Sequence, residues 1–338
     1  MRKITSFGAV EELPLKTTAG DNICVSAEAI AACRKLECES KKYLCMDLPE
    51  TIARKVVLID GFHSATIEGA RTTLEKVTEI VERRNQSTSK SDRMVLNSVK
   101  AMQMLYTEPF NQQVFQKAWK IIVNGVCENM NAGVNGYRTG MVYIGSADRM
   151  IHVPETPENI ESRMDDLFMF MDEDGNILFR SLVFHFYCAY IHPFCDGNGR
   201  IARAASSAYL YHRFSHRFGN LPIAKAINES LSGYYRALYD SENLIANKVD
   251  ITPFILYMND RYLEAMKQYS LYGKSLTDEE SMVMTKMLKS GKGTISVEKC
   301  AKMLKCTQQE ALNVLNDMLE KGFLSFYSGE YRIGWREK

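Results

Sequence analysis

The sequence predicts a mainly α-helical protein with one β-hairpin near the middle of the chain and a small separate domain at its C-terminal end. Apolar residues recur at helical spacing through most of the chain. Within residues 141–153, two short apolar runs flank a glycine-containing turn, which is typical of a hairpin. Residues 276–338 contain three further helical segments and then an alternating apolar and polar segment, so we expect them to form a domain of their own.

The composition of the chain excludes several classes of protein. The chain has 338 residues, with 42 Lys and Arg against 41 Asp and Glu, so no global field draws it to nucleic acid or to an anionic membrane. Its nine cysteines include no CxxC pair, and no apolar run reaches the roughly 20 residues that span a bilayer. The N-terminal stretch lacks the apolar core of a signal peptide. We therefore expect a cytoplasmic protein with reduced thiols and no membrane partner.

The N-terminal third is predicted to be helical after a short lead-in. Pro14 and Gly20 interrupt any long element in residues 1–25, which we expect to be extended or loosely docked. Apolar spacing then predicts helices over residues 26–44, 48–67, 72–84, 93–106 and 111–123. The polar segment 85–92 and the glycine-rich segment 131–140 are predicted loops.

The hairpin is predicted from its two apolar strands, residues 141–144 and 150–153. Gly145 lies in the connection between them, and Pro154 and Pro157 end the second strand because proline cannot donate to a ladder. Helices are predicted to follow over residues 157–171, 176–190, 199–214, 230–240 and 252–271. By itself this hairpin is simply a surface element that covers the core.

The stretch from residue 191 to 203, IHPFCDGNGRIAR, joins two of these helices and can bind phosphate. The turn Gly197-Asn198-Gly199 opens the second helix, whose free N–H groups and positive dipole end attract anions. Glycine leaves the backbone open to phosphate oxygens. Arg200 and Arg203 project from one face of this helix toward the same anion. We therefore expect a bound polyphosphate here.

Two more side chains of this stretch suit catalysis. His192 ends the preceding helix, and an imidazole pKa of about 6.5 suits a general base. Asp196 precedes the turn, where one carboxylate with nucleotide oxygens and waters suits Mg²⁺. Each of these residues, taken alone, can also have a purely structural role. Asp196 or Asn198 can cap a helix, His192 can form hydrogen bonds between two helices, and the arginines can be exposed to solvent.

Together these residues form the pattern HxFx(D/E)GNGRxxR, which resembles the signature of the Fic family at every position. The resemblance implies a protein adenylyltransferase that uses ATP and Mg²⁺ to move AMP to a Ser, Thr or Tyr hydroxyl of a target protein. It assigns the following roles: His192 as the base, Phe194 packed inward to fix the loop, Asp196 on Mg²⁺, the backbone of Gly197, Asn198 and Gly199 as an anion hole, Arg200 on the α- and β-phosphates, and Arg203 on the γ-phosphate.

A second motif lies at the end of the helix predicted over residues 48–67. Ser64 to Gly69, SATIEG, matches the inhibitory motif (S/T)xxxE(G/N) that many Fic proteins carry. The resemblance implies that Glu68 reaches Arg203 and forms the ion pair that the γ-phosphate would otherwise make. In the ordinary reading Ser64 is a helix hydroxyl, Glu68 a surface acid and Gly69 the residue that stops the helix.

The resemblance also assigns the hairpin and one tyrosine. The hairpin becomes the Fic flap, in which Met150, Ile151, His152 and Val153 pair with the target backbone and present its hydroxyl to the base. His152 is then a contact on the substrate side. Tyr234, with its neighbour Tyr235, is expected at the adenine end of the nucleotide, although core packing suits either tyrosine equally well. The resemblance covers residues 50–265, and the predicted regions are 1–110, 111–272 and 276–338.

The tail resembles a winged helix. Its sequence predicts three helices and then a hairpin, over residues 277–290, 296–304 and 307–319 and around Ser328-Gly329. The would-be recognition helix, TQQEALNVLNDMLE, contains three acidic residues and no Lys or Arg, so DNA is an unlikely partner. A protein contact or homo-oligomer suits this tail better. Two other functions stay open, a nucleotide-sensing transcriptional regulator and a Fic variant that transfers a phosphate or another nucleotide.

Overall fold

The computed structural model describes residues 10–45, 47–48, 50–83, 89–127, 133, 135–146, 149–243, 248–274, 277–289, 294–321, 323–327 and 329–333. The chain divides into two compact units, one of Met1–Leu44 with Lys55–Met266 and one of Cys45–Arg54 with Lys267–Lys338. The boundary near residue 110 that the sequence suggested falls inside the first unit. The N-terminal helices therefore share one body with the segment that carries the phosphate-binding stretch.

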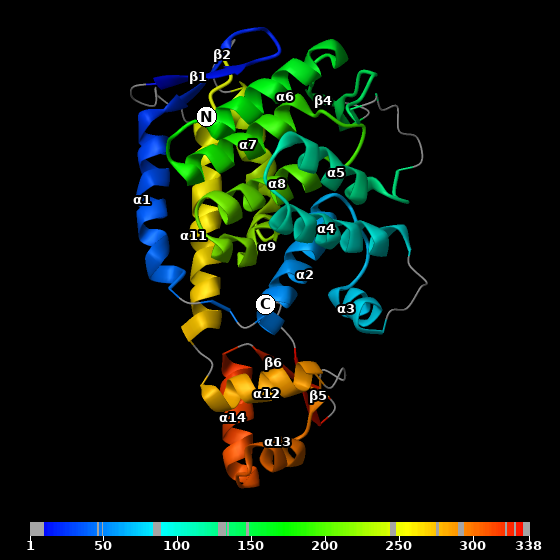
Figure 1. Ribbon diagram of the computed structural model, residues 1–338, viewed down its shortest axis with the longest axis vertical. Coiled ribbons are helices and arrows are strands. Elements are labelled where there is room, and N and C mark those ends of the chain that lie inside the picture. Colours follow the sequence, from blue (N-terminus) through cyan, green and yellow to red (C-terminus); the bar gives the residue numbers. More distant parts are fainter. Residues whose placement is uncertain are drawn as a thin grey trace. The chain divides into compact units, whose positions relative to one another are not determined.

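The predicted mainly α-helical fold is confirmed (Figure 1). The elements before the C-terminal tail are β1 (Val10–Lys16), β2 (Asn22–Ser26), α1 (Ala27–Tyr43), α2 (Glu50–Ile67), α3 (Leu74–Arg83), α4 (Lys90–Thr107), α5 (Gln112–Val123), β3 (Ile144–Ser146), β4 (Arg149–His152), α6 (Pro157–Asp172), α7 (Ile177–Ile191), α8 (Asn198–Arg213), η1 (His216–Asn220), α9 (Ile223–Asn228), α10 (Leu231–Asn243) and α11 (Thr252–Lys274). Elements η1 and α9 are too short to show a helical apolar period, and the sequence did not predict them.

Helices α7 and α8 form the centre of the first unit. They pack against each other, and α1, α4, α5 and α6 pack around them (Figure 1). Nearly all of α7 is buried, which explains its unbroken run of apolar and aromatic residues. Buried Ala and Ser residues line much of α8, and such small side chains let neighbouring helices approach closely. The loop between these two helices is the stretch 191–203, so a rigid scaffold holds it at both ends.

The lead-in of residues 1–25, which we expected to be extended or loosely docked, is instead an ordered hairpin where the structure describes it, from residue 10 onward. Strands β1 and β2 pair antiparallel, and Leu15 and Val25 are fully buried. The turn of the hairpin binds α7, because Tyr187 Oη donates to the backbone oxygen of Lys16 at 2.7 Å. Alternation within a seven-residue strand was the signal for β1, and Pro14 obscured it.

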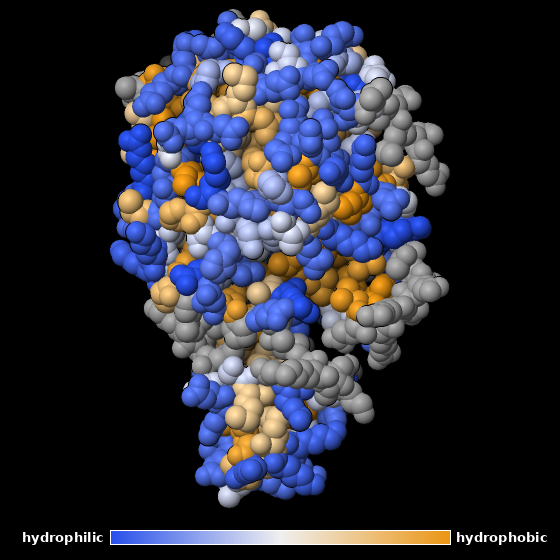
Figure 2. Space-filling model, in the orientation of Figure 1, coloured by the Kyte–Doolittle hydropathy of each residue, from blue (hydrophilic) through white to orange (hydrophobic). Residues whose placement is uncertain are grey.

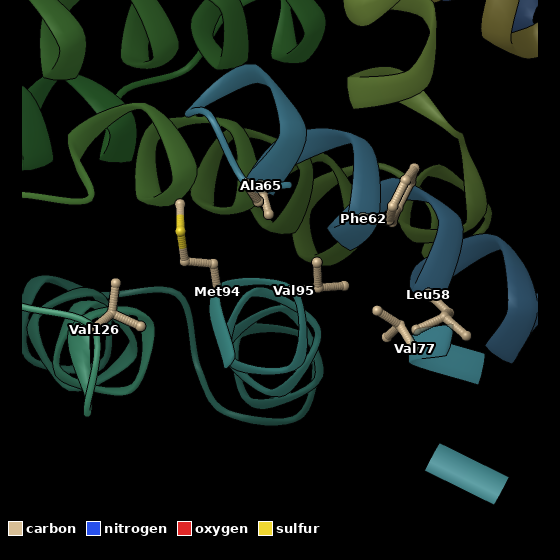
Figure 3. Close-up of a cluster of buried hydrophobic side chains, with 8 residues drawn as sticks. Leu58, Phe62, Ala65, Val77, Met94, Val95 and Val126 are labelled. Atoms are coloured by element: carbon tan, nitrogen blue, oxygen red, sulfur yellow. The ribbon is translucent and has the colours of Figure 1, made fainter. Parts of the chain in front are cut away.

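Helix α2, which carries the SATIEG motif, is fixed by a hydrophobic cluster (Figure 3). The buried members of the cluster come from α2, α3, α4 and the segments that follow α2 and α5: Leu58, Phe62, Ala65, Ala70, Val77, Met94, Val95 and Val126. Burial of this many apolar side chains stabilises the contact of α2 with α3 and α4. The cluster thereby positions the C-terminal end of α2.

Helix α9 holds α2 from another side. Asp60 Oδ1 accepts a hydrogen bond from the backbone N–H of Ala224, and burial raises the pKa of Asp60 to about 7. His63 Nδ1 lies 3.0 Å from Asn228 Nδ2. Burial also lowers the pKa of His63 to about 4, so this imidazole is neutral at pH 7 and accepts from the amide.

Three predicted boundaries were wrong. Helix α4 begins at Lys90 and not at Arg93, because Ser89 and Asp92 form a capping box within the segment that we expected to be a loop. The first strand of the hairpin is Ile144–Ser146, which begins later than the predicted range 141–144. The second strand is Arg149–His152, which begins and ends one residue earlier than the predicted range 150–153. Pairing of Ile144 with His152 sets this register, which apolar runs alone do not reveal.

The C-terminal unit contains α12 (Asp278–Lys289), β5 (Thr294–Ile295), α13 (Val297–Leu304), α14 (Gln308–Glu320), β6 (Leu324–Tyr327) and β7 (Glu330–Ile333). Its three helices and final hairpin follow the predicted order. Strand β5, which the sequence did not predict, joins the hairpin in a sheet of order β5-β7-β6. Lys321 on this unit binds Glu280 at 2.9 Å and Asp317 at 2.7 Å, which joins the ends of α12 and α14.

The face of the protein in Figure 2 is mostly hydrophilic, with hydrophobic residues scattered between the polar ones. Over the described parts of the chain, none of the helices combines the length and the apolar character needed to cross a bilayer.

Candidate active site

The loop between α7 and α8 begins and ends with left-handed residues. His192, the C-cap of α7, has φ 53° and ψ 59°, a conformation that costs free energy for any residue other than glycine. Gly197, which precedes α8, has φ 82°, and a Cβ there would lie 3.0 Å from Ile122 Cγ2. Both geometry and space therefore require glycine at position 197. The strain at His192 needs support from neighbours to persist.

The middle of the loop is fixed by packing and by side-chain hydrogen bonds. Phe194 is fully buried and stacks on Trp119, with ring centroids 4.3 Å apart and an interplanar angle of 7°. Asn198 Oδ1 accepts from the backbone N–H of Phe194 at 2.9 Å, and its Nδ2 donates to the oxygen of the same residue at 2.8 Å. Trp119 Nε1 donates to the backbone oxygen of Asp196 at 2.9 Å. These contacts hold the loop in one conformation at the start of α8.

His192 is prepared to accept a proton. Its Nδ1 lies 3.3 Å from the backbone oxygen of Ala189, which can only accept, so Nδ1 carries the hydrogen and Nε2 keeps its lone pair. Burial lowers the pKa of His192 to about 4, and the charges of His152 and Arg138 act in the same direction. The imidazole is therefore neutral at pH 7, as a general base must be.

The titration of His192 tests this environment directly. We expect the ring-proton signal of His192, followed by NMR in the full chain, to titrate with a midpoint near 4, because burial disfavours the charged ring. The signal is assigned as the one that disappears in His192→Ala. A histidine-containing model peptide serves as the reference, with a midpoint near the ordinary value of about 6.5. A midpoint near 6.5 for His192 would contradict the buried, neutral base.

Asp196 and Arg200 form an ion pair at the start of α8. Arg200 Nη2 lies 3.0 Å from Asp196 Oδ1; the guanidinium is almost fully buried, whereas the carboxylate side chain is 42% exposed. Among the described residues, no three His, Cys, Asp or Glu side chains cluster tightly enough to hold a metal ion alone. One exposed carboxylate fits Mg²⁺, which takes most of its ligands from water and phosphate oxygens. Asp196 therefore suits an ion that arrives with a nucleotide.

The end of α2 has the geometry that its motif predicts. Gly69 has φ 86°, and the N–H of Ala70 donates to the oxygen of Ala65 at 3.0 Å while that of Gly69 donates to Thr66 at 2.9 Å. This bond pattern is a Schellman motif, which ends a helix at a glycine. Ser64 and Glu68, one turn apart, consequently project from the last turn of α2 in the same direction.

Both side chains bind Arg203, a contact between residues more than a hundred positions apart. Arg203 Nε donates to Ser64 Oγ at 3.0 Å, and Nη2 donates to the backbone oxygen of Ser64 and to Glu68 Oε1, each at 2.9 Å. Burial lowers the pKa of this guanidinium, but the charge and hydrogen bond of Glu68, together with the influence of Tyr234, outweigh burial and the net shift is upward. The structure thus contains the ion pair that the sequence predicted.

The Glu68 carboxylate also lies against the start of α8. A Cβ added to Gly199 would lie only 2.2 Å from Glu68 Oε1, so glycine is needed there for this approach. Glu68 therefore occupies the end of α8 where free N–H groups and the helix dipole favour an anion. Arg203 Nη1 is buried and makes no hydrogen bond with any described residue. A buried guanidinium with one nitrogen left for a further acceptor, beside a helix N-terminus, is suited to a phosphate.

A cavity of about 830 Å³ opens onto these groups. Its lining includes Glu68, His192 and Gly199 from the anion site, and Ile144 and His152 from the hairpin. The rest is formed mainly by α10: Ser232, Tyr234, Tyr235, Arg236, Leu238, Tyr239 and Glu242. Its volume and its mixture of aromatic and charged side chains are typical of a site for a small molecule.

The two tyrosines that the sequence placed near the nucleotide both line this cavity, yet they differ. Tyr234 is buried, and its hydroxyl lies 3.0 Å from His185 Nε2. Burial raises the pKa of Tyr234 to about 12. Tyr235 is half exposed, and its hydroxyl donates to the backbone oxygen of Ile67 at 3.3 Å. Tyr234 is therefore a core residue that also lines the cavity, and its place at the adenine end of the nucleotide stays a prediction.

The hairpin borders the cavity through Ile144 and His152, and its role as a flap stays a prediction. Val153 is 45% exposed, as a residue available to a target should be. The side chains of Met150 and Ile151 lie outside the described residues. His152 was expected to face the substrate, but it is 8% exposed and binds Glu242 and the backbone oxygen of Tyr190. This correction follows from the register, which turns His152 toward α7 and α10.

Arg138 is a site residue that the sequence analysis missed. It is 2% exposed, and its Nε donates to the backbone oxygen of His192 at 2.8 Å. Nη1 donates to the oxygen of Gly140 at 2.8 Å, and Nη2 donates to that of Glu155. Arg138 thereby ties both ends of the hairpin segment to the strained residue 192. The sequence did not indicate a structural role for Arg138, because its hydrogen-bond acceptors are backbone carbonyl groups, which any residue has.

The comparison with known families covers the part of the chain that holds this loop. Residues 109–210 match the Fic/DOC family. This segment, which contains the loop between α7 and α8, is therefore similar to the Fic/DOC family. The protein adenylyltransferase Fic of Nematostella vectensis is 30% identical over 234 residues, which are 62% of this chain and 49% of that protein. Protein adenylyltransferase fic-1 of Caenorhabditis elegans is 29% identical over 166 residues, which are 44% of this chain and 30% of that protein.

Solved structures confirm the Fic-type helical fold. A Fic family protein from Desulfovibrio desulfuricans has a TM-score of 0.64 at 20% identity, over 92% of this chain and 97% of its own. A Fic domain containing signalling protein from Bacteroides thetaiotaomicron has a TM-score of 0.58 at 20% identity, over 73% of this chain and 98% of its own. The chain spans at most about half the length of the two adenylyltransferases that it matches.

Proposed function

We propose that this protein transfers AMP from ATP to a Ser, Thr or Tyr hydroxyl of a target protein and that Glu68 inhibits the transfer. One observation carries the proposal: the Glu68 carboxylate sits between buried Arg203 and the start of α8, beside the neutral base His192. Because this position stabilises the negative charge of a carboxylate, a phosphate group can bind there when the carboxylate is absent. The adenylyltransferase names of the relatives agree with this reading.

The groups that would receive ATP come from one end of α8. The backbone N–H groups of Gly197, Asn198 and Gly199 would bind the α- and β-phosphates with Arg200, and Arg203 would bind the γ-phosphate. Mg²⁺ held by Asp196 and phosphate oxygens would neutralise part of the charge that develops on the leaving pyrophosphate. The cavity along α10, with Tyr234 near its inner end, would hold the ribose and adenine.

Transfer itself would depend on His192. Its Nε2 takes the proton from the target hydroxyl, the oxygen forms a bond to the α-phosphorus, and the bond to the β-phosphate bridging oxygen breaks with release of pyrophosphate. The strand β4 region, including Met150, Ile151, His152 and Val153, would pair with the target backbone. The rest of catalysis is positioning and charge stabilisation by fixed groups.

Inhibition would result from occupancy of Arg203. The three hydrogen bonds from Arg203 to Ser64 and Glu68 leave only Nη1 for a phosphate, and Glu68 would repel the γ-phosphate. A triphosphate could then bind only in a position that does not align its α-phosphorus with the incoming hydroxyl. Gly69, which ends α2, holds the carboxylate in this place.

The proposal also covers the cellular location of the protein and the role of its C-terminal tail. No disulfide involves any of the nine cysteines, all of which lie in the described part of the chain, and this supports a cytoplasmic location. The winged-helix-like tail would contact protein, a second copy of the chain included, because the described face of α14 has no basic residue that could bind a phosphate backbone.

ATP labelled at the α- or the γ-phosphate tests the reaction, with the Glu68→Gly variant as the enzyme. Label should enter protein from α-labelled ATP and not from γ-labelled ATP, because the α-phosphorus is attacked and pyrophosphate leaves. Transfer from the γ-position instead would show a phosphotransferase. Faster transfer from another α-labelled nucleoside triphosphate would identify a different nucleotide, and no transfer from either label would favour the regulator that only senses nucleotide.

A further inference from the structure

His152 on strand β4 is held from two sides. Its Nδ1 lies 2.6 Å from Glu242 Oε2, and its Nε2 lies 2.7 Å from the backbone oxygen of Tyr190. Carboxylate and carbonyl oxygens only accept hydrogen bonds, whereas a neutral imidazole has a single N–H. Both ring nitrogens of His152 therefore face an oxygen, that of the Glu242 side chain on one side and that of the Tyr190 backbone on the other. The two side chains are 8% and 17% exposed, so water screens this pair little.

This pair connects three separate segments of the first unit. His152 comes from the hairpin, Tyr190 lies two residues before the base His192 on α7, and Glu242 lies in the last turn of α10. The ring of Tyr190 also lies 5.1 Å from that of His152. A shift of β4 would therefore break contacts with the helix that carries the base and with the helix that lines the cavity.

The other restraints on β4 are weak in comparison. Strands β3 and β4 share only three paired positions, with an irregularity between Ile144 and Gly145. Such a short isolated pair is marginal in water. Arg138 fixes the two ends of the segment, at Gly140 and Glu155, but contacts neither strand. Among the side chains of β4 that the structure describes, His152 is bound to both α7 and α10.

We propose that the His152–Glu242 pair is a latch that sets the position of strand β4 relative to His192 and thereby positions the hydroxyl of the target. Both are positioning residues, since they act through the strand and not on the reacting atoms. This inference rests on the proposed function for its consequence, because a target strand must add to β4. The latch itself depends only on the contacts described above.

Hydrogen exchange of the full chain tests the latch without any activity. In Glu242→Ala or His152→Ala, backbone amides of residues 149–153 should exchange about tenfold faster or more, while those of residues 177–191 in α7 keep their protection. Glu242→Gln is the matched conservative variant. Its amide can donate to Nδ1 of a neutral His152 whose Nε2 still donates to Tyr190, so protection of the strand should persist. Glu158→Ala, an exposed site on α6, is the surface control.

Kinetics then test the consequence, in the Glu68→Gly background with α-labelled ATP and self-modification as the probe. Either alanine variant should lower the rate at saturating ATP about tenfold, and the double variant should lose no more than one of them because they share one interaction. The ATP concentration for half-maximal rate should change less than about threefold, since the phosphate contacts remain. Glu158→Ala should match the background.

Three results would overturn the latch. These are unchanged exchange of residues 149–153 in both alanine variants, losses that multiply in the double variant, and exchange in Glu242→Gln as fast as in Glu242→Ala. If the Glu68→Gly background transfers no label at all, the proposed function fails, but the exchange experiment still decides whether the latch exists. The two hypotheses can therefore fail separately.

Discussion

Glu68→Gly should transfer AMP about ten- to a hundredfold faster than the unmutated protein, most visibly as self-modification. The substitution removes the charge-assisted hydrogen bond of Glu68 Oε1 to Arg203 Nη2, which is 2.9 Å long, and the carboxylate that lies against Gly199. Hydrogen bonds to charged groups contribute roughly 1.5–3 kcal/mol, and about 1.4 kcal/mol is a tenfold change in an equilibrium constant. The freed Arg203 can then bind the γ-phosphate, and the start of α8 can bind the other phosphates.

Two further variants separate this cause from a general loosening of α2. Adding Arg203→Ala to Glu68→Gly should cancel the gain, because the two substitutions act on one interaction. Glu108→Gly, an exposed glutamate directly after α4, is the matched control and should leave the rate unchanged. An unaltered rate in Glu68→Gly, with ATP and Mg²⁺ in excess, would mean that Glu68 is only a helix-end acid.

His192→Ala, made in the activated Glu68→Gly background, should reduce transfer of α-label by a factor of about a hundred to ten thousand, the usual contribution of a positioned general base. Nε2 of this ring bears the free lone pair that would take the hydroxyl proton. ATP should still bind with little change, because the backbone of the turn and the two arginines, which would hold the phosphates, do not depend on the imidazole. Filter binding with labelled ATP measures the second quantity.

The control for this variant is His212→Ala, which removes an exposed imidazole from α8 far along the helix from the loop. It should transfer label at the background rate. If His192→Ala transfers at that rate as well, another group is the base and the assignment is wrong. A loss of ATP binding equal to the loss of transfer would instead show that His192 supports the loop, because its left-handed backbone conformation is unusual.

Much of the site could be predicted from the sequence because its residues are close together in the chain. The stretch from His192 to Arg203 contains the base, the carboxylate, the turn and both arginines, and its glycines show where backbone must bend or be approached. The predicted inward packing of Phe194 and the helix stop at Gly69 are both present in the structure. Each depends on local chemistry, namely an aromatic in an apolar setting and a residue without Cβ at positive φ.

Other features could not be predicted because their partners lie far away in the chain. No motif indicated the hydrogen bonds from Arg138 to the backbone of His192 and to both ends of the hairpin segment, since carbonyl groups have no sequence signature. The N-terminal strand β1 was missed because docking against α7, and not propensity, orders it. The register of the hairpin likewise decided that His152 turns inward.

By itself the sequence determined a mainly helical chain, an anion-binding turn with its two arginines, and a carboxylate motif at the end of an N-terminal helix, because helical period, glycine and charge act over a few residues. Only the tertiary structure decided that α2 ends with Glu68 between Arg203 and Gly199, that His192 is buried enough to be neutral, and that His152 binds Glu242. These properties depend on which surfaces pack together and on how much water they exclude. Packing sets the distances between charges, and burial sets the free energy of placing a proton on a ring.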